Sequence, residues 1–392
     1  MRALEWLNFF VADVQAGVGP FLAAYLASSG WNPGRVGYAL TFGGMTTVVL
    51  QLPAGAWIDA TRRKRALLAW MIAAIVAGAL LFAWKPAVPQ VAAGQLLIGS
   101  AGAFLGPLLA AITLGIVGKS AFDRQFGRNQ AFNSAGNVFT ALLLAAISFT
   151  LGNRTIFLTA AALAVPALAV LRMLDGSAID YERARGLEKT RGDGAGSSES
   201  LGLLLRDRVL VMFLACAFLF HLANAAMLPE LGEMLSKGQS RTAVPFMSAC
   251  IIVTQCVIAA FAAKIGALAA TRGRRSLLLD GFAILPVRGI LYTLTSFTPA
   301  LIAIQILDGV ANAIFVVVSV LVIADRTRGT GRFNLAQGAL ALVVGSGAAL
   351  SNALGGELAQ RFGFHVSFLG LAGIAAFATI LLFFALPETL EA

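Results

Sequence analysis

Twelve apolar runs occupy most of this sequence, and each is about long enough to cross a lipid bilayer. A hydrocarbon core of about 30 Å requires a helix of about 20 apolar residues. The runs form two sets of six, at 5–28, 35–58, 66–84, 90–117, 128–151 and 155–173, and at 209–232, 243–268, 276–296, 299–323, 333–359 and 364–386. We therefore predict an all-α membrane protein with twelve transmembrane helices in two six-helix bundles.

The composition excludes most other classes of protein. Of the 392 residues, 58% are apolar and 12% are charged, whereas about a quarter of the residues of a soluble domain are charged. The 3 cysteines are too few for a disulfide scaffold. The net charge of +10 is no nucleic-acid footprint, because the basic residues cluster between the apolar runs. We expect a lipid bilayer as the surrounding medium and no nucleic-acid partner.

A polar segment separates the two sets of apolar runs. Residues 174–206 are charged and rich in glycine and serine, so they cannot span a membrane. The predicted organisation is an N-terminal bundle at 1–173, a linker at 174–206 and a C-terminal bundle at 207–392.

The distribution of lysine and arginine predicts the orientation of the helices. If the amino terminus is cytoplasmic, the segments on the inner side hold 21 of the 29 lysines and arginines and those on the outer side hold 6. Loops that are rich in Lys and Arg stay in the cytoplasm. We therefore predict that both termini are cytoplasmic, in a bacterial-type inner membrane.

The two halves of the sequence repeat one another. GAWIDATRRKR begins at Gly55 and GALAATRGRRS begins at Gly266, while Gln95 and Gln305 open similar segments in the fourth and tenth runs. Because each repeat has an even number of spans, both repeats start on the same side of the membrane. Two parallel, pseudo-symmetric halves are an architecture of secondary transporters.

The repeated loop resembles a motif of the major facilitator superfamily. The resemblance covers the whole chain and implies that family's fold, with transport of a small solute by alternating access. In the family, the acidic and basic residues of this motif form a cytoplasmic gate. The residues of this chain that match the motif are Gly55, Asp59, Arg63 and Lys64 in the first copy, and Gly266, Gly273, Arg274 and Arg275 in the second. Arg62 replaces the usual glycine and Ala270 the usual acid, so the gate acid is carried over to Asp59 alone.

Polar residues within the apolar runs are the candidate site. An ionisable side chain at a helix centre costs at least about 2.5 kcal/mol, so its presence points to a function. The family resemblance implies that helices one, four, seven and ten line a central cavity, and three of these helices carry Asp13, His221 and Asp308. Asp13 is the first candidate for proton coupling or cation binding. The full set of predicted proton-coupling and substrate-binding residues is Asp13, Gln15, His221, Asn224, Asp308, Asn312, Asn133 and Gln337.

Several alternatives stay open at this point. An alternative role for Asp308 is that of structural counter-ion to Arg288 in the preceding run. Asp13, His221 and Cys216 are residue types that bind divalent transition metals, so a metal exporter is a second hypothesis, and a transporter-like sensor is a third. Glu230 and Glu233 lie near the outer end of the seventh run, where we expect an interfacial position.

No feature of the sequence predicts an enzyme or a cofactor. A complete phosphate-binding loop is absent, since Gly118-Lys119-Ser120 lacks the first glycine and has Thr113 in its place. No cluster of catalytic residues is apparent. We therefore expect an ion gradient to drive proton-coupled export of a small polar or cationic solute by a monomer.

Overall fold

The computed structural model describes residues 2–16, 21–151, 154–185, 206–236, 240–327 and 333–389. Within these ranges the regular elements are α-helices and two short 3-10 helices, with no strand. The predicted all-α class is confirmed. A membrane provides no water to satisfy backbone polar groups, so a spanning chain of this kind forms helices whose hydrogen bonds are internal.

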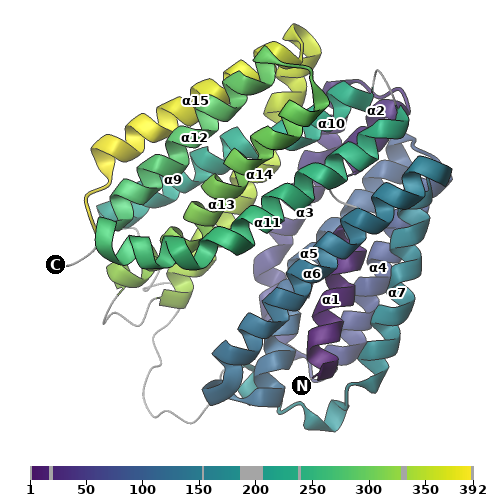
Figure 1. Cartoon of the computed structure of the whole chain (residues 1–392). Coiled ribbons are helices and arrows are strands. Elements are labelled where there is room, and N and C mark those ends of the chain that lie inside the picture. Colours follow the sequence, from purple (N-terminus) through teal and green to yellow (C-terminus); the bar gives the residue numbers. More distant parts are fainter. Residues whose placement is uncertain are drawn as a thin grey trace. The chain divides into compact units, whose positions relative to one another are not determined.

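The described part of the first half contains seven α-helices and the two 3-10 helices (Figure 1). They are α1 (Arg2–Ala16), α2 (Leu22–Ser28), α3 (Pro33–Ala60), α4 (Lys64–Trp84), α5 (Val88–Val117), α6 (Lys119–Leu151), α7 (Arg154–Met173), η1 (Gly176–Ala178) and η2 (Arg183–Arg185). The second half contains α9 (Arg208–Asn224), α10 (Met227–Ser236), α11 (Ser240–Arg272), α12 (Arg274–Leu294), α13 (Thr298–Thr327), α14 (Phe333–Phe362) and α15 (Phe364–Ala385).

Ten helical stretches in the described ranges are long and apolar enough to cross a membrane. They coincide with ten of the twelve predicted runs, and α9 and α10 together form one of them, at Arg208–Ser236. The first predicted run is not one continuous described helix, because α1 ends at Ala16 and α2 begins at Leu22. The second corresponds to α3, whose 28 residues are long enough but whose glycines, threonines and glutamine dilute its apolar character.

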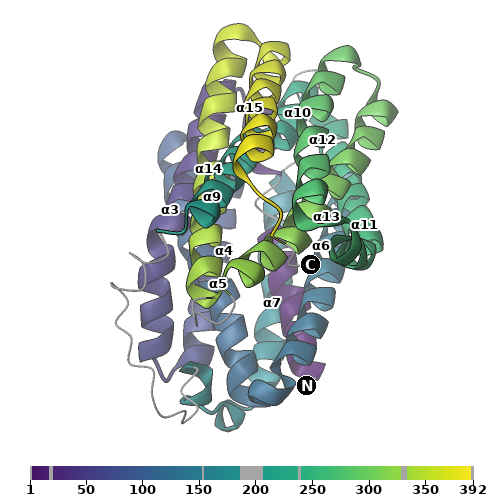
Figure 2. The same cartoon turned by 90° about the vertical axis from the view of Figure 1, so that its left-hand side faces the viewer.

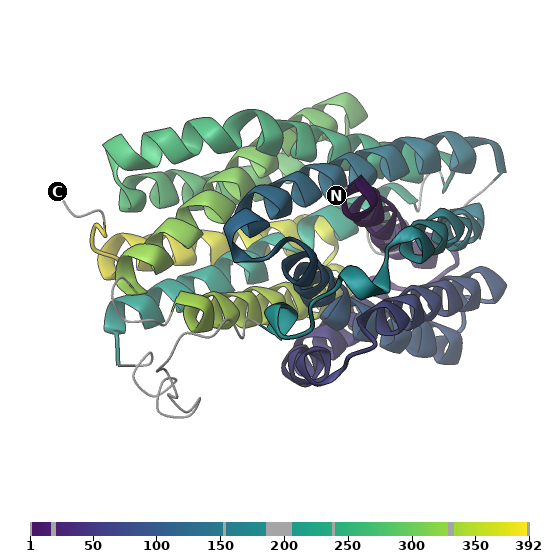
Figure 3. The ribbon, with the colours of Figure 1, turned by 90° about the horizontal axis from the view of Figure 1, so that it is seen from below.

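The chain forms two compact units. Unit 1 comprises Met1–Trp31, Phe42–Asp193 and Leu235–Ser248, and unit 2 comprises Asn32–Thr41, Gly194–Met234 and Ala249–Ala392. In unit 1, α1 packs against α6 and α7, and Figure 3 shows the purple α1 beside the blue α6 and the teal α7. In unit 2, α9 packs against α14 and α15, as Figure 2 shows. The predicted bundle boundaries at 173 and 207 stay a prediction.

The sequence repeat reappears in the way that helices pack. In unit 1, Gly136 of α6 lies against the backbone carbonyl of Phe9 in α1, so that a Cβ at this glycine would be 2.5 Å from that oxygen. In unit 2, Gly347 of α14 lies in the same way against the carbonyl of Phe218 in α9, also at 2.5 Å. Each contact needs a residue without a side chain, because an added atom would overlap backbone.

The beginning of the predicted linker packs against unit 1. The Asp180 amide donates to the Gly115 carbonyl at the end of α5 at 3.0 Å, and Ile179 and Ala184 are buried. Residues 186–205, the remainder of the linker apart from Arg206, lie outside the described residues.

Candidate functional site

Asp13 lies on α1 and is fully buried in unit 1. The Thr140 hydroxyl of α6 donates to its Oδ1 at 3.0 Å. Its Oδ2 accepts no hydrogen bond from any described residue, and no described lysine or arginine forms an ion pair with it. Gly136 lets α6 approach this part of α1 closely. Asp13 is therefore a desolvated carboxylate with one oxygen available to bind a proton or a cation.

Two predicted amides lie on the helices that hold Asp13. Gln15 is half-buried one residue before the end of α1. Asn133 is half-buried on α6, where its Oδ1 accepts from Asn137 Nδ2 at 3.4 Å. Asn133 and Thr140 are seven residues apart, so they share one face of α6.

A buried ion pair between Arg288 and Asp308 forms the centre of a polar network in unit 2. Arg288 on α12 is 1% exposed. Its Nη1 donates to both Asp308 and Asn224, and its Nε donates to the Tyr292 hydroxyl at 2.9 Å. The same hydroxyl accepts from Gln305 Nε2 at 2.6 Å. Residues from α9, α12 and α13 therefore share one buried charge pair.

Asp308 has both carboxylate oxygens engaged. Besides Arg288, Oδ1 accepts from Asn312 Nδ2 at 3.0 Å, and Oδ2 accepts from the Thr254 hydroxyl at 3.2 Å. The pairing with Arg288 that the sequence left open is thus present in the structure. Asp308 has less capacity than Asp13 to take up a proton or a cation, since its charge is already compensated.

Asn224 is the last residue of α9, where the seventh span is broken. The backbone amide of Ala226, in the turn before α10, donates to the Ser351 hydroxyl of α14 at 2.9 Å. This bond satisfies a buried amide that the interrupted helix leaves open. Broken helices place polar groups near the midplane of transporters, so the position of Asn224 at the break fits the predicted role in binding.

Among the described residues, the other predicted residues form no hydrogen bond to these two clusters. His221 has Nδ1 3.1 Å from the Ala217 carbonyl and packs its ring against Phe220 and Phe315. Gln337 is half-buried on α14. Cys216 is buried on α9. No group of three histidine, cysteine or acidic side chains in the described part of the chain is arranged to hold a metal ion, so the metal hypothesis gains no support.

Comparison with known proteins establishes the family. The model of the Major Facilitator Superfamily matches residues 6–285 and 216–392. Two Mycobacterium tuberculosis proteins, each named as an uncharacterized MFS-type transporter, are 38% identical over 392 residues, which is all of this chain and 94% of each relative. The chain belongs to the major facilitator superfamily. It is a transporter and not an enzyme.

Solved structures of the superfamily share the fold. The nucleoside transporter NupG has a TM-score of 0.82 at 15% identity and covers 97% of both chains. A D-xylose-proton symporter has a TM-score of 0.72 at 12% identity, covering 99% of this chain and 97% of the other. A POT family transporter in complex with 5-aminolevulinic acid has a TM-score of 0.77 at 14% identity, covering 98% and 95%. The recognition from the loop motif and the predicted fold are confirmed.

The second copy of the superfamily loop motif is tied to the last described residues of the chain. Arg274 opens α12 and pairs through Nε with Asp325 of α13 at 3.1 Å, while its Nη1 donates to the Ala269 carbonyl at 2.6 Å. The Glu388 carboxylate accepts from the backbone amides of Arg274 and Arg275 at 2.9 and 3.1 Å. Acidic groups are favourable at such a helix N-terminus. Gly273, which joins α11 to α12, has a φ of 90° that favours glycine.

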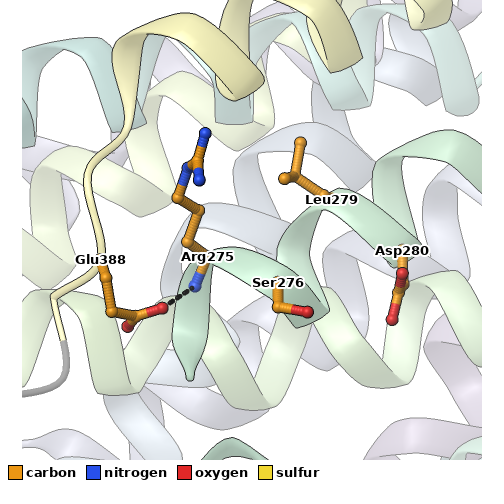
Figure 4. A pocket seen from close by; sticks show the side chains of 5 residues that line it. All are labelled: Arg275, Ser276, Leu279, Asp280 and Glu388. Carbon is orange, nitrogen blue, oxygen red and sulfur yellow. Dashed lines mark hydrogen bonds between the residues drawn. The ribbon is translucent and has the colours of Figure 1, made fainter. Parts of the chain in front are cut away.

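A pocket of about 310 Å³ lies beside this motif, lined by Arg275, Ser276, Leu279, Asp280 and Glu388. Figure 4 shows Glu388 bonded to the Arg275 backbone, with the Asp280 side chain pointing away from both. Asp280 forms an ion pair with Arg272 at 3.1 Å. The pocket is thus bounded by acids whose charges are already compensated.

The first copy of the motif shows a related arrangement at Lys64, the first residue of α4. Its Nζ donates to the carbonyls of Ile58 and Thr61 at 2.5 and 3.3 Å. Lys64 and Arg274 are each the first residue of the helix that follows the loop, and both are bonded to the end of the preceding helix. Asp59 and Arg63 are exposed and Gly55 has open space around it, so their role in a gate stays a prediction.

Replacing Arg274 with alanine is expected to destabilise unit 2 by about 1.5–3 kcal/mol, the range for a hydrogen bond to a charged group. The matched control is Arg272→Ala, two residues earlier. Its ion pair with Asp280 is about half exposed, and such surface pairs contribute about 0–1 kcal/mol. Thermal unfolding of the detergent-solubilised variants measures the difference, and equal melting temperatures would contradict the structural role of Arg274.

Sequence reasoning missed three buried acids. Glu5 is 2% exposed and pairs with Arg128 of α6 at 2.9 Å; it was overlooked because it stands at the edge of its apolar run. Glu230 and Glu233 are each 2% exposed and so are buried within the protein, which their place near the end of a run did not indicate, while the interfacial position predicted for them stays a prediction. The burial of these two acids depends on packing between helices, which sequence periodicity alone does not reveal.

Proposed function

We propose that this superfamily member exports a small polar or cationic solute in exchange for protons. The observation that carries the proposal is the burial of the Asp13 carboxylate. One of its oxygens accepts a hydrogen bond from Thr140. The other accepts no hydrogen bond from any described residue. An ionised carboxylate in such surroundings is costly unless it is compensated. A proton or a cationic group of the solute supplies that compensation.

Exchange follows from a single carboxylate that binds one partner at a time. If the proton and the solute compete for Asp13, a proton that enters from outside displaces the solute, which leaves. The proposed setting is a bacterial-type inner membrane with both termini cytoplasmic, which the excess of Lys and Arg in the predicted inner loops supports. We further propose that the protein acts as a monomer.

The names of the structural neighbours are compatible with a polar solute. They are named as transporters of nucleosides, D-xylose and peptides, which are all small polar molecules. At identities of 12–15% the likeness concerns the fold, so the choice among such solutes rests on experiment.

The experiment reconstitutes the protein in liposomes and follows lumenal pH while candidate solutes are added. The wild type is expected to show solute-induced proton flux, and Asp13→Asn is expected to reduce it to the level of protein-free liposomes, because asparagine cannot release a proton. Thr140→Val removes one hydrogen bond, worth about 0.5–1.5 kcal/mol, and should shift the pH dependence without abolishing flux.

The control variant is Asp175→Asn, which makes the same chemical change at an exposed residue outside the spans. Its flux should equal that of the wild type. Undiminished flux in Asp13→Asn would overturn the proposal, provided that its melting temperature shows a folded protein.

A further inference from the structure

Glu230 is a second buried carboxylate, and it lies in unit 2. It is 2% exposed on α10, within the span Arg208–Ser236. Its Oε1 lies 2.9 Å from the Ser367 hydroxyl of α15, and its Oε2 accepts no hydrogen bond from any residue that the structure describes. The same hydroxyl lies 3.1 Å from the Gly355 carbonyl of α14. Three helices therefore meet at one acid.

The number of protons at this contact distinguishes the two forms of Glu230. A serine hydroxyl has one proton to donate, whereas Ser367 faces two acceptors, the Glu230 carboxylate and the Gly355 carbonyl. If Glu230 is ionised, one of the two oxygen–oxygen contacts contains no proton. If Glu230 is neutral, its O–H donates to Ser367, and Ser367 donates to Gly355. The neutral acid satisfies both contacts.

The charged and titratable groups on the neighbouring elements do not compensate an ionised Glu230. Arg288 of α12 is engaged by Asp308 and Asn224, and Arg361 of α14 is paired with Glu357. Other titratable groups on these elements include an imidazole packed on its own helix, an exposed imidazole and a second buried acid, namely His221, His365 and Glu233. Among the described residues, no basic side chain forms an ion pair with Glu230.

Close backbone packing surrounds the acid. A Cβ added at Gly355 would overlap Glu230 Oε1 and lie 2.9 Å from the Ala226 side chain, so the carboxyl group fills the space that this glycine leaves. There is no room here for a hydration shell around a charge, and burying a charge without a partner is costly.

We propose that Glu230 is a proton-binding site, which holds α10 against α14 and α15 in its neutral form and releases that packing when the proton leaves. Unit 2 then binds a proton at Glu230, separately from the proton proposed at Asp13 in unit 1. It goes beyond the proposed function and does not require Asp13 to carry the transported proton.

Infrared difference spectroscopy of the full chain in lipid nanodiscs, titrated with pH and without solute, tests the proposal directly. The carbonyl stretch of protonated carboxylic acids should appear for the wild type, Glu230→Gln should remove one component of that band, and the same component should persist in Asp13→Asn. Ser367→Ala removes the acceptor of the acid proton and should shift this band. A spectrum of Glu230→Gln that matches the wild type at every pH would overturn the assignment.

Thermal unfolding supplies a second measurement. The side-chain amide that Glu230→Gln introduces can donate to Ser367 as the neutral acid does, so the variant should fold and its melting temperature should not follow the titration. The wild type should lose thermal stability as the pH rises and the stabilising proton leaves. Parallel losses in the two proteins would argue against a proton at Glu230. Solute-driven flux in Asp13→Asn is read separately, so the two proposals fail independently.

Discussion

Replacing Asp308 with leucine is expected to lower the melting temperature sharply, whereas replacing Asp308 and Arg288 together is expected to restore most of the loss. Removing one member of a buried ion pair costs about 3–5 kcal/mol, because the other charge stays buried and uncompensated. Arg288 is 1% exposed, and in the single variant its hydrogen-bond partners among the described residues are Asn224 and Tyr292. The double variant Arg288→Met with Asp308→Leu removes both charges.

The comparison also decides between two readings of Asp308. A structural counter-ion predicts that the double variant is folded and retains transport, while a coupling residue predicts that transport is lost in both variants. Melting temperatures in detergent and solute-driven proton flux in liposomes provide the two measurements. If the single and double variants are destabilised equally, the loss of stability does not come from the uncompensated charge of Arg288.

The second large loss of stability is expected at two glycines, each of which lets two helices of its own unit pack closely. Gly136→Ala and Gly347→Ala each place a methyl group 2.5 Å from a backbone carbonyl, of Phe9 and Phe218 respectively. Overpacking of this kind costs about 1–3 kcal/mol, and the backbone of a packed helix cannot turn aside as a side chain can. Thermal unfolding should show a clear loss for both variants.

The same helices offer matched controls. Gly127 on α6 and Gly338 on α14 have open space where a Cβ would be. Alanine in their place should stabilise each helix by about 0.5–1 kcal/mol, because glycine is unfavourable in a helix interior. A loss of stability at Gly127 or Gly338 as large as that at Gly136 or Gly347 would contradict the packing argument.

The sequence predicts the helices well because the bilayer constrains length and composition together. The repeat of Gly55 and Gly266 and the polar linker were enough to recognise the superfamily. Asp308 and Asn312, both predicted as site residues, are four positions apart and so share one face of a helix, and the structure connects them directly. Spacing relates residues on one helix, which is why these parts of the site could be predicted.

The spacing of residues along one helix does not predict contacts between different helices. Nothing in the sequence indicates that Thr140 donates to Asp13 across 127 positions, or that Ser367 reaches Glu230 across 137. The hydrophobicity of α10 does not reveal that its helix is interrupted at Ala225–Ala226. Partners of this kind depend on tertiary packing, which a single sequence does not encode in any local pattern.

The bonds of Lys64 and Arg274 across their turns have a mechanical consequence. Each basic side chain fastens the end of one long helix to the start of the next, α3 to α4 in one case and α11 to α12 in the other. We expect a helical hairpin with such a bond to bend little at the turn between its two helices. The backbone ladder of unit 2 is interrupted between α9 and α10, next to Asn224, and we expect this unit to bend there more readily than at the α11–α12 corner.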